Sequence, residues 1–222
     1  MERLAAGALS LGVALDERAL CRFALYLEEL GRWNRRVNLT AARSDEEVVE
    51  RHFLDSLTPL SLVGPAGRLL DVGSGGGFPG LPMKIARPGL DVTLVDSREK
   101  KVFFLRHVIR RLGLDGVEAL ACRVESDAFR RLHGHRYDCV ISRAFSALDD
   151  FFRLAAPLAA PGGLVVAMKG PLGAELEAEI EEVSRRRGLA AAIREVAAPL
   201  AARRTTLVAW RIPRQSLSGR GR

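Results

Sequence analysis

From Arg68 onward, short apolar runs alternate with longer amphipathic stretches, and few folds accommodate such an alternation. The runs that predict strands are 69–71, 91–96, 117–121, 138–142 and 164–169. The stretches that predict helices are 80–86, 98–112, 125–132, 148–158 and 174–187. This order predicts a parallel sheet with helices on both faces. Two further runs, 190–196 and 205–212, have only a short connection and predict an antiparallel pair, so the expected fold is α/β with a seven-stranded, mostly parallel sheet.

The first quarter of the chain contains no strand candidate and predicts helices. Apolar side chains recur at three-to-four spacing over residues 16–36. A second helix is predicted from Ser44, whose hydroxyl can cap the first turn while Glu47 returns the bond, and it weakens at Pro59. We therefore expect a helical cap at 1–64 packed on the core, a sheet domain at 65–212, and a disordered tail at 213–222 rich in Arg, Ser and Gly.

The composition excludes several classes of chain. With 222 residues, 48% of them apolar and 27% charged, the chain has the balance of an ordinary globular domain. That balance excludes a wholly disordered chain, a collagen and a membrane bundle. The 34 Lys and Arg exceed the 27 Asp and Glu by seven. This basic surplus indicates a polyanionic partner only weakly, because many basic proteins bind nothing acidic.

The cysteines and the N-terminus bear on the compartment. Cys21, Cys122 and Cys139 lack the spacing of a zinc site or a disulfide framework, and their apolar neighbours predict buried thiols in a reducing, cytoplasmic setting without a metal. The apolar run at 4–15 follows the single basic residue Arg3 and has no clear cleavage site. A docking helix is therefore favoured over a signal peptide. No run reaches the roughly 20 apolar residues of a membrane span.

The glycine-rich segment 70–80 follows the first predicted strand and carries the strongest ligand signal. Its glycines allow a sharp turn and a close approach of a ligand to the main chain. Asp96, 23 residues after Gly73, ends the next strand, where it can accept hydrogen bonds from a ribose. NAD and S-adenosylmethionine both fit, and a turn without ligand is a third reading. Pro79 removes one anion-binding N–H and Asp71 adds negative charge, so a pyrophosphate is disfavoured relative to a sulfonium.

Polar residues also stand where the other predicted strands end. In open α/β sheets the ligand lies outside the carboxyl ends of the strands. The residues at those ends are Asp71, Asp96, Arg123 with Glu125, Ser142 with Arg143, and Lys169. We interpret them as one functional rim, although any single polar residue at a strand end can equally mark the start of a solvated loop.

At these positions the sequence resembles the ribosomal RNA small subunit methyltransferase G family, also called the glucose-inhibited division protein B family. The likeness runs from about Leu25 to Val208. Its motifs are Trp33-Asn34, Val37-Asn38-Leu39-Thr40, Arg51-His52-Phe53-Leu54-Asp55-Ser56-Leu57, Phe78-Pro79-Gly80-Leu81-Pro82, Leu94-Val95-Asp96-Ser97, Lys100-Lys101-Val102-Phe103-Phe104-Leu105, Arg123-Val124-Glu125, Ile141-Ser142-Arg143-Ala144-Phe145 and Met168-Lys169-Gly170. Thr205-Thr206 after Arg203-Arg204 fits the family pattern less well, and the tail after Ile212 does not align.

The resemblance implies a class I S-adenosylmethionine-dependent methyltransferase with a Rossmann-like sheet and an N-terminal helical extension. It further implies methylation of N7 of guanine 527 in 16S rRNA, with naked rRNA, the small subunit or an assembly intermediate as partner and no obligate protein partner. The implied cofactor contacts are Gly73, Phe78, Asp96, Ser97, Arg98, Val124, Glu125 and Arg143. Substrate contacts are expected at Asn38, Arg123 and Lys169, although Asn38 could equally cap its own loop.

The chemistry expected of such an enzyme requires no general base. Guanine N7 carries no proton, so the enzyme only has to hold it in line with the methyl group. Accordingly, the sequence offers no Ser/His/Asp or Cys/His constellation, and no catalytic residue is predicted. We expect His52 to form a structural hydrogen-bond pair with Asp55, and His133 and His135 to lie in loops. The rivals are a class I enzyme that methylates a protein or small molecule, and a ribosome-assembly factor without turnover.

The remaining basic residues have plain structural interpretations. Arg106 and Arg110 fall on one face of the helix predicted at 98–112, and we expect that face to be solvated. Arg185–Arg187 stand at the end of the helix predicted at 174–187, where positive charge interacts favourably with the helix dipole.

Overall fold

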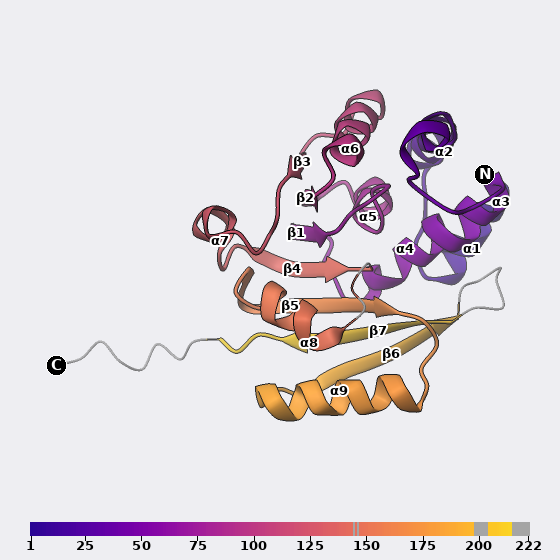
Figure 1. Ribbon diagram of the computed structural model, residues 1–222. Coiled ribbons are helices and arrows are strands. Elements are labelled where there is room, and N and C mark those ends of the chain that lie inside the picture. Colours follow the sequence, from indigo (N-terminus) through magenta and orange to yellow (C-terminus); the bar gives the residue numbers. More distant parts are fainter. Residues whose placement is uncertain (144, 146, 198–203, 215–222) are drawn as a thin grey trace.

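The computed structural model describes residues 1–143, 145, 147–197 and 204–214 and contains the predicted seven-stranded sheet (Figure 1). The strands are β1 Gly67–Val72, β2 Leu90–Asp96, β3 Val117–Ala121, β4 Tyr137–Ser142, β5 Ala159–Lys169, β6 Ala191–Ala197 and β7 Arg204–Arg211. Their order is β3-β2-β1-β4-β5-β7-β6, in which β1 to β5 are parallel and β7 pairs antiparallel with both β5 and β6. The expected fold class, including its antiparallel pair, is confirmed.

The helices that follow the strands begin and end close to the predicted positions. They are α5 Gly80–Ala86, α6 Glu99–Arg111, α7 Asp127–His133, α8 Leu148–Ala155 and α9 Ala174–Arg187. Helix α7 begins after Ser126, whose hydroxyl accepts a hydrogen bond from the backbone N–H of Phe129. His133 is therefore the last residue of a helix, and its assignment to a loop was wrong, whereas His135 does lie between α7 and β4.

The N-terminal segment is helical, as expected, but its second half is irregular. Its elements are α1 Glu2–Ser10, α2 Glu17–Val37, α3 Asp45–Val48, a π-helical stretch Val49–Leu54, α4 Asp55–Leu57 and a 3₁₀ turn Thr58–Ser61. Asp16 caps α2 through Ala19 N at 2.7 Å, and Ser44 caps α3 through Glu47 N at 3.2 Å. Glu47 accepts from Arg43 N rather than from Ser44 N, so the reciprocal half of the predicted capping box is wrong.

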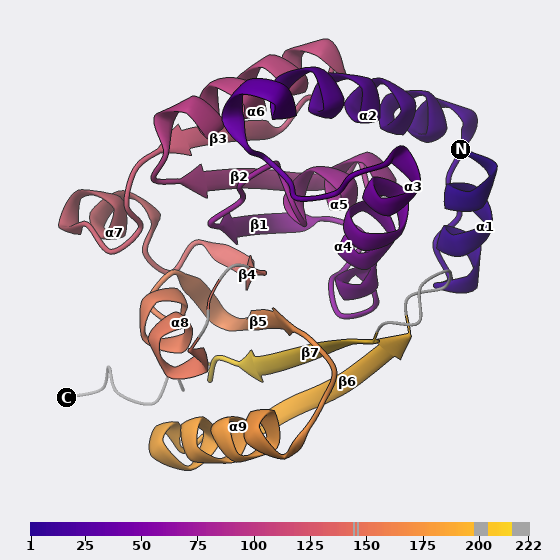
Figure 2. The ribbon, with the colours of Figure 1, turned by 45° about the vertical axis from the view of Figure 1, so that its right-hand side comes forward.

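The two faces of the sheet carry separate hydrophobic cores. On one face α5, α6 and the N-terminal helices form one cluster, in which Phe23 and Phe53 pack with Leu69 and Leu94 of the sheet. On the other face α7, α8 and α9 form the second cluster around Phe151 and Trp210 (Figure 2). The first cluster runs across the expected boundary between 64 and 65. The division into domains stays a prediction, and most of the tail at 213–222 lies outside the described residues.

One further expectation needs correction, and another needs narrower bounds. Cys21 is exposed and Cys122 is half-buried, so only Cys139 is the buried thiol that was expected of all three. The helix expected within the apolar run 4–15 is α1, which ends at Ser10 before the left-handed residue Gly12. In the described parts of the chain, no helix is long and apolar enough to cross a membrane.

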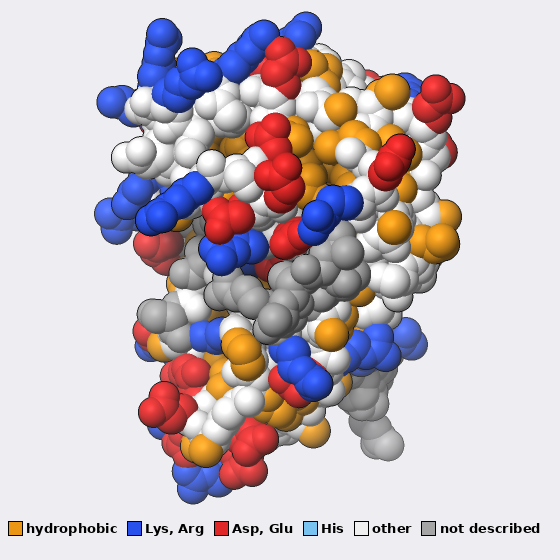
Figure 3. Space-filling model, turned by 90° about the vertical axis from the view of Figure 1, so that its right-hand side faces the viewer, with side chains coloured by type: hydrophobic (Ala, Val, Ile, Leu, Met, Phe, Trp, Pro, Cys, Tyr) orange, Lys and Arg blue, Asp and Glu red, His pale blue; other side chains and the backbone are white. Residues whose placement is uncertain are grey.

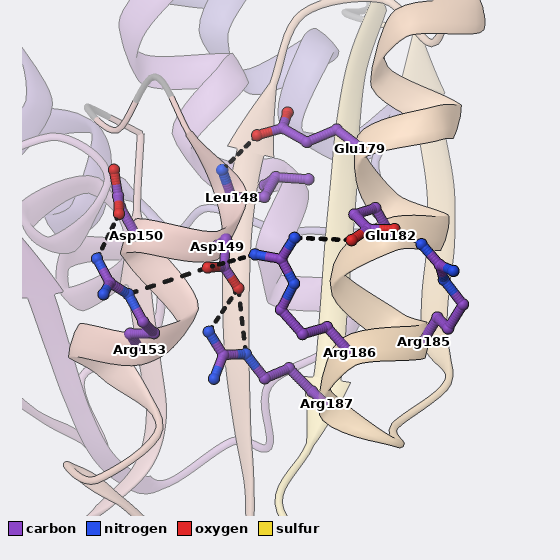
Figure 4. A network of polar contacts seen from close by, with 9 residues as sticks. All are labelled: Leu148, Asp149, Asp150, Arg153, Glu179, Glu182, Arg185, Arg186 and Arg187. Carbon is purple, nitrogen blue, oxygen red and sulfur yellow. Dashed lines mark hydrogen bonds and ion pairs between the residues drawn. The ribbon is translucent and has the colours of Figure 1, made fainter.

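Helices α8 and α9 are joined by a polar network on the second face (Figure 4). Asp149 accepts from Arg187 Nη2 at 2.6 Å and from Arg186 Nη1 at 3.3 Å, and the hydrogen bond from Arg187 lowers the pKa of this carboxyl. Glu179 accepts from the backbone N–H of Leu148 at 2.6 Å and so caps the start of α8. Arg186 and Arg187 therefore pair with a specific carboxylate, beyond any interaction with the helix dipole.

Candidate functional site

The glycine turn between β1 and α5 has a backbone that favours glycine. Gly73, Gly75 and Gly77 have φ of +75°, +57° and +99°, in the left-handed region that other residues avoid. A Cβ at Gly77 would lie 2.6 Å from Leu81 Cδ1, and one at Gly76 would lie 3.3 Å from the carbonyl oxygen of Leu39. The turn is therefore closely packed against the N-terminal segment below it, which fixes its outer surface for a ligand.

Asp96, at the end of β2, lies directly across from the turn. Its Oδ2 accepts from Gly75 N at 3.0 Å, and its Oδ1 accepts from Arg98 N at 2.8 Å. The Nζ of Lys101 lies 4.0 Å from Oδ2. Each carboxylate oxygen has two lone pairs, so both keep capacity for a further donor, such as a ribose hydroxyl.

A cleft of about 310 Å³, which we call the cofactor cleft, opens at the ends of β1, β2 and β3. Five of the eight predicted cofactor contacts line it, namely Gly73, Asp96, Ser97, Val124 and Glu125. Arg123, predicted to contact the substrate, lines the same cleft. The structure thus brings together residues from three strand ends that the sequence separates by about 50 positions.

A second cavity, of about 320 Å³, lies between the N-terminal segment and the ends of β4 and β5. His52, Asp55, Arg143, Lys169 and Thr205 are among the residues that line it. Lys169 Nζ donates to the carbonyl oxygen of Phe145 at 3.1 Å, and Phe145 is among the residues that line the cofactor cleft. The two cavities are therefore neighbours on the same edge of the sheet.

Arg143 lines the second cavity rather than the cofactor cleft. Its Nη1 donates to Asp55 Oδ2 and to the carbonyl oxygen of Arg51, both at 3.1 Å, and its Nη2 donates to His52 Nδ1 at 2.8 Å. The guanidinium carbon lies 5.3 Å from the centre of the Phe78 ring, on which the His52 ring also stacks. The expected pair of His52 with Asp55 is thus wrong, because both side chains bind Arg143 instead.

Two rim residues expected from the sequence are not on the rim. Asp71 is fully buried beneath the turn, where its Oδ2 accepts from Gly80 N at 2.9 Å and its Oδ1 has no partner among the described residues. Burial, which disfavours the charged form, raises the pKa of Asp71 to about 7. Ser142 is also buried and donates to the carbonyl oxygen of Val72 at 2.7 Å. Asp71 therefore stabilises the turn through Gly80, and Ser142 links β4 to β1. Neither side chain faces solvent.

The remaining predicted residues lie at the edges of the site. Phe78 is buried beneath Arg143, and Arg98 precedes α6. Asn38 is exposed in a left-handed conformation at the end of α2, while Asn34 holds the loop. Asn34 Oδ1 accepts from Leu39 N at 2.7 Å and from Thr40 N at 2.9 Å. Sequence reasoning assigned the possible capping role to Asn38 and missed Asn34, although its spacing from the Asn-Leu-Thr turn could have indicated it.

Tyr26, which the sequence did not single out, ties the N-terminal segment to the turn. Its hydroxyl donates to the carbonyl oxygen of Gly76, and its buried ring stacks on Phe53 and Phe78. Tyr26→Phe is expected to lower the free energy of unfolding by about 1–3 kcal/mol, because the carbonyl loses its donor in a buried place. Urea unfolding measures this change, and an unaltered midpoint would show that the hydrogen bond adds no net stability.

The face that carries the ends of β4 and β5 mixes charges of both signs (Figure 3). Lys and Arg side chains are interspersed there with Asp and Glu, and hydrophobic atoms are visible between them. The basic surplus of the chain therefore does not form one uniform patch on this face.

Comparisons with known proteins agree with this geometry. The family described as GidB, rRNA small subunit methyltransferase G, matches residues 20–205. The ribosomal RNA small subunit methyltransferase G of Geobacter metallireducens is 47% identical over 79% of each chain, and that of Syntrophotalea carbinolica is 43% identical over 89% of this chain and 91% of its own.

Solved structures show the same fold at low sequence identity. A SAM-dependent methyltransferase from Aquifex aeolicus superposes with a TM-score of 0.55 at 20% identity, covering 75% of this chain and 93% of its own. A Burkholderia thailandensis 1,6-didemethyltoxoflavin-N1-methyltransferase gives 0.56 at 18% identity over 86% and 88%. The predicted fold, that of class I S-adenosylmethionine-dependent methyltransferases, and the cofactor class that goes with it are confirmed. Since the family match spans most of the chain and agrees with the close relatives, this chain belongs to the rRNA small subunit methyltransferase G family.

Proposed function

We propose that this protein transfers a methyl group from S-adenosylmethionine to N7 of guanine 527 in 16S rRNA. The observation that carries the proposal is the pair of adjoining cavities at the carboxyl edge of the sheet. One of them presents the glycine turn and Asp96, which suit an adenosine. The other is lined by four basic residues, Arg51, Arg143, Lys169 and Arg204, against the two acidic residues Glu50 and Asp55, and this basic excess suits a polar, anionic partner. Family membership supplies the rRNA substrate class, and the specific nucleotide and atom remain our proposal.

The residues of the cofactor cleft fit this cofactor. Asp96 keeps free lone pairs for the ribose hydroxyls, and the missing Cβ of Gly73 lets the ligand approach the main chain. Val124 and Glu125 line the part of the cleft next to β3 and would hold the base of the adenosine. Ser97 and Arg98 connect Asp96 to α6. Arg143 lies outside this cleft, above Phe78 in the neighbouring second cavity, and would bind the carboxylate of the cofactor where the ligand extends into that cavity.

The proposed reaction requires positioning and exclusion of water rather than proton transfer. The bound cofactor supplies a methyl group on a positively charged sulfur. N7 of guanine has a lone pair and no proton, so no residue has to act as a base. The chain's task is to hold the base in line with that methyl group, an effect that can supply several kcal/mol. His52 has its pKa lowered to about 3 by burial and by the nearby Arg143 and Arg51, and it therefore stays neutral during the reaction.

On the substrate side, Lys169 is the residue we expect to matter most. It lines the second cavity and lies next to the cofactor cleft through its bond to Phe145 O. Lys169→Ala should weaken RNA methylation about tenfold or more, while the Kd for S-adenosylmethionine stays within about twofold. Transfer of labelled methyl groups to RNA and calorimetry with the cofactor measure the two effects. A large loss of cofactor affinity would instead place Lys169 in the cofactor site. Arg123 and Asn38 stay predicted substrate contacts.

The decisive experiment offers labelled S-adenosylmethionine with naked 16S rRNA, small subunits, ribosomal proteins and small metabolites, followed by mapping of the modified nucleotide. Labelled guanine 527 with the methyl group on N7 is the expected result. Labelling of protein but not RNA would overturn the proposal in favour of another class I enzyme. Cofactor binding without any transfer would favour an assembly factor, and a different labelled nucleotide would correct the site while keeping the reaction class.

A further inference from the structure

We infer that His52 is a positioning residue that fixes the Arg143 guanidinium between the second cavity and the glycine turn. This inference rests on the proposed role of Arg143 in binding the cofactor carboxylate. It also makes the N-terminal segment part of the site rather than only a cap, because His52 lies in the stretch Val49–Leu54 of that segment.

Three acceptors hold the guanidinium of Arg143 in place. An arginine side chain has many rotamers, and a free guanidinium at a cavity wall would sample several of them. Here Asp55 Oδ2, Arg51 O and His52 Nδ1 each accept one N–H, at 3.1, 3.1 and 2.8 Å. The three acceptors lie within five consecutive residues, 51–55, at the end of the π-helical stretch and the start of α4. The guanidinium plane is therefore fixed by one short segment of the N-terminal helices.

The two hydrogen-bond partners of His52 determine its tautomer. Because the Arg143 guanidinium can only donate, Nδ1 of His52 must accept, and the ring proton belongs on Nε2. Nε2 lies 2.5 Å from Thr40 Oγ1, to which it can donate. Thr40 Oγ1 also accepts from Ala42 N at 3.0 Å and is thus anchored in its own loop. The imidazole accordingly connects the loop at Thr40 to the guanidinium.

The orientation of the His52 ring is fixed by stacking on Phe78. His52 stacks on Phe78 with a centroid distance of 4.6 Å and an interplanar angle of 15°. The same Phe78 ring lies under the guanidinium of Arg143 at 5.3 Å. Phe78 belongs to the glycine-rich segment and contacts both side chains. The turn, His52 and Arg143 therefore pack together. Asp55 completes it, because its other oxygen accepts from the Thr205 hydroxyl on β7.

Two substitutions of His52 distinguish a positioning role from a contribution to stability alone. In His52→Phe the ring can still stack on Phe78 but Nδ1 is lost, whereas in His52→Asn the amide oxygen can take the place of Nδ1. We expect His52→Phe to raise the Kd for S-adenosylmethionine about tenfold, and His52→Asn to stay within about threefold of the unmodified protein. Calorimetry on the full chain measures both values. Equal losses in the two variants, or no loss in His52→Phe, would overturn the inference.

A double-mutant cycle tests that His52 acts through Arg143. Arg143→Ala should raise the Kd more than His52→Phe does, and adding His52→Phe to Arg143→Ala should change it by less than about twofold. Additive effects would contradict the inference. An unchanged Kd in Arg143→Ala would overturn both the inference and the assigned role of Arg143, while methyl transfer to RNA would still judge the proposed function separately.

The matched control is His107→Phe. His107 lies on α6, bonds to the buried carboxylate of Glu29 at 2.9 Å and packs at a tilted angle against Trp33, outside both cavities. Its loss should lower the thermal midpoint without altering the Kd for S-adenosylmethionine. A change in Kd as large as that of His52→Phe would show that loss of stability alone explains both results.

Discussion

Gly73→Asp is expected to abolish binding of S-adenosylmethionine while leaving the protein folded. Gly73 has φ of +75° and lines the cofactor cleft at the end of β1. An aspartate there would put a carboxylate into the space of the ligand, beside the carboxylate of Asp96. Backbone strain adds a loss of about 1–2 kcal/mol in the free energy of unfolding. Calorimetry measures the binding and urea unfolding measures the strain.

Gly12→Asp is the matched control for this substitution. Gly12 has the same φ of +75°, and a Cβ at that position would meet no atom within 4 Å. It should show a comparable loss of stability and an unaltered Kd for the cofactor. Gly73→Ala separates charge from backbone strain and should retain part of the affinity. A folded Gly73→Asp variant that binds with normal affinity would refute the assignment of the cofactor cleft.

The strands and helices of the core could be predicted because their signals are local. Helices α5 and α9 begin and end at the predicted residues, since their ends are marked by Pro88 after α5 and by Gly173 and Gly188 on either side of α9. Strand β5 begins at Ala159, five residues before the predicted start. Pro161 and the two glycines after it resemble a turn, but here they form the irregular beginning of an extended strand, where the pairing with β4 shifts register.

The sequence predicted the site as a set of residues at the ends of strands. It could not predict which of their side chains face the ligand. Position along a strand predicts the edge of the sheet but not which face a side chain takes, so Asp71 and Ser142 were placed on the rim although both are buried. Tyr26 and His52 acquire their roles from partners 50 and 91 residues away. No local pattern encodes such contacts, because they depend on how the N-terminal helices pack against the sheet.

Asp71→Asn is expected to stabilise the protein more at pH 8 than at pH 5. Burial raises the pKa of Asp71 from 3.8 to about 7 in the folded protein. Between these values the folded state holds a proton that the unfolded state has lost, so the free energy of unfolding falls as the pH rises from about 4 to about 7. An asparagine is neutral throughout and can still accept from Gly80 N. At about 1.4 kcal/mol per pH unit, the two pH units between pH 5 and pH 7 change the free energy of unfolding by about 2–3 kcal/mol.

The effect of Asp71→Asn must be measured as the difference in free energy of unfolding between the variant and the unmodified protein. The reason is that His52 and Asp71 make stability change with pH in opposite directions. The pKa of His52 is lowered to about 3, so the stability that depends on this residue is lost as the pH falls below about 6.5. The measured slope of the unmodified protein is the sum of both effects, and subtraction removes the contribution of His52. Asp115→Asn, at an exposed position, should change stability equally at pH 5 and pH 8. If Asp71→Asn did the same, Asp71 would have to be charged in the folded protein at both pH values, and the Oδ1 that lacks a partner would need a cation beside it.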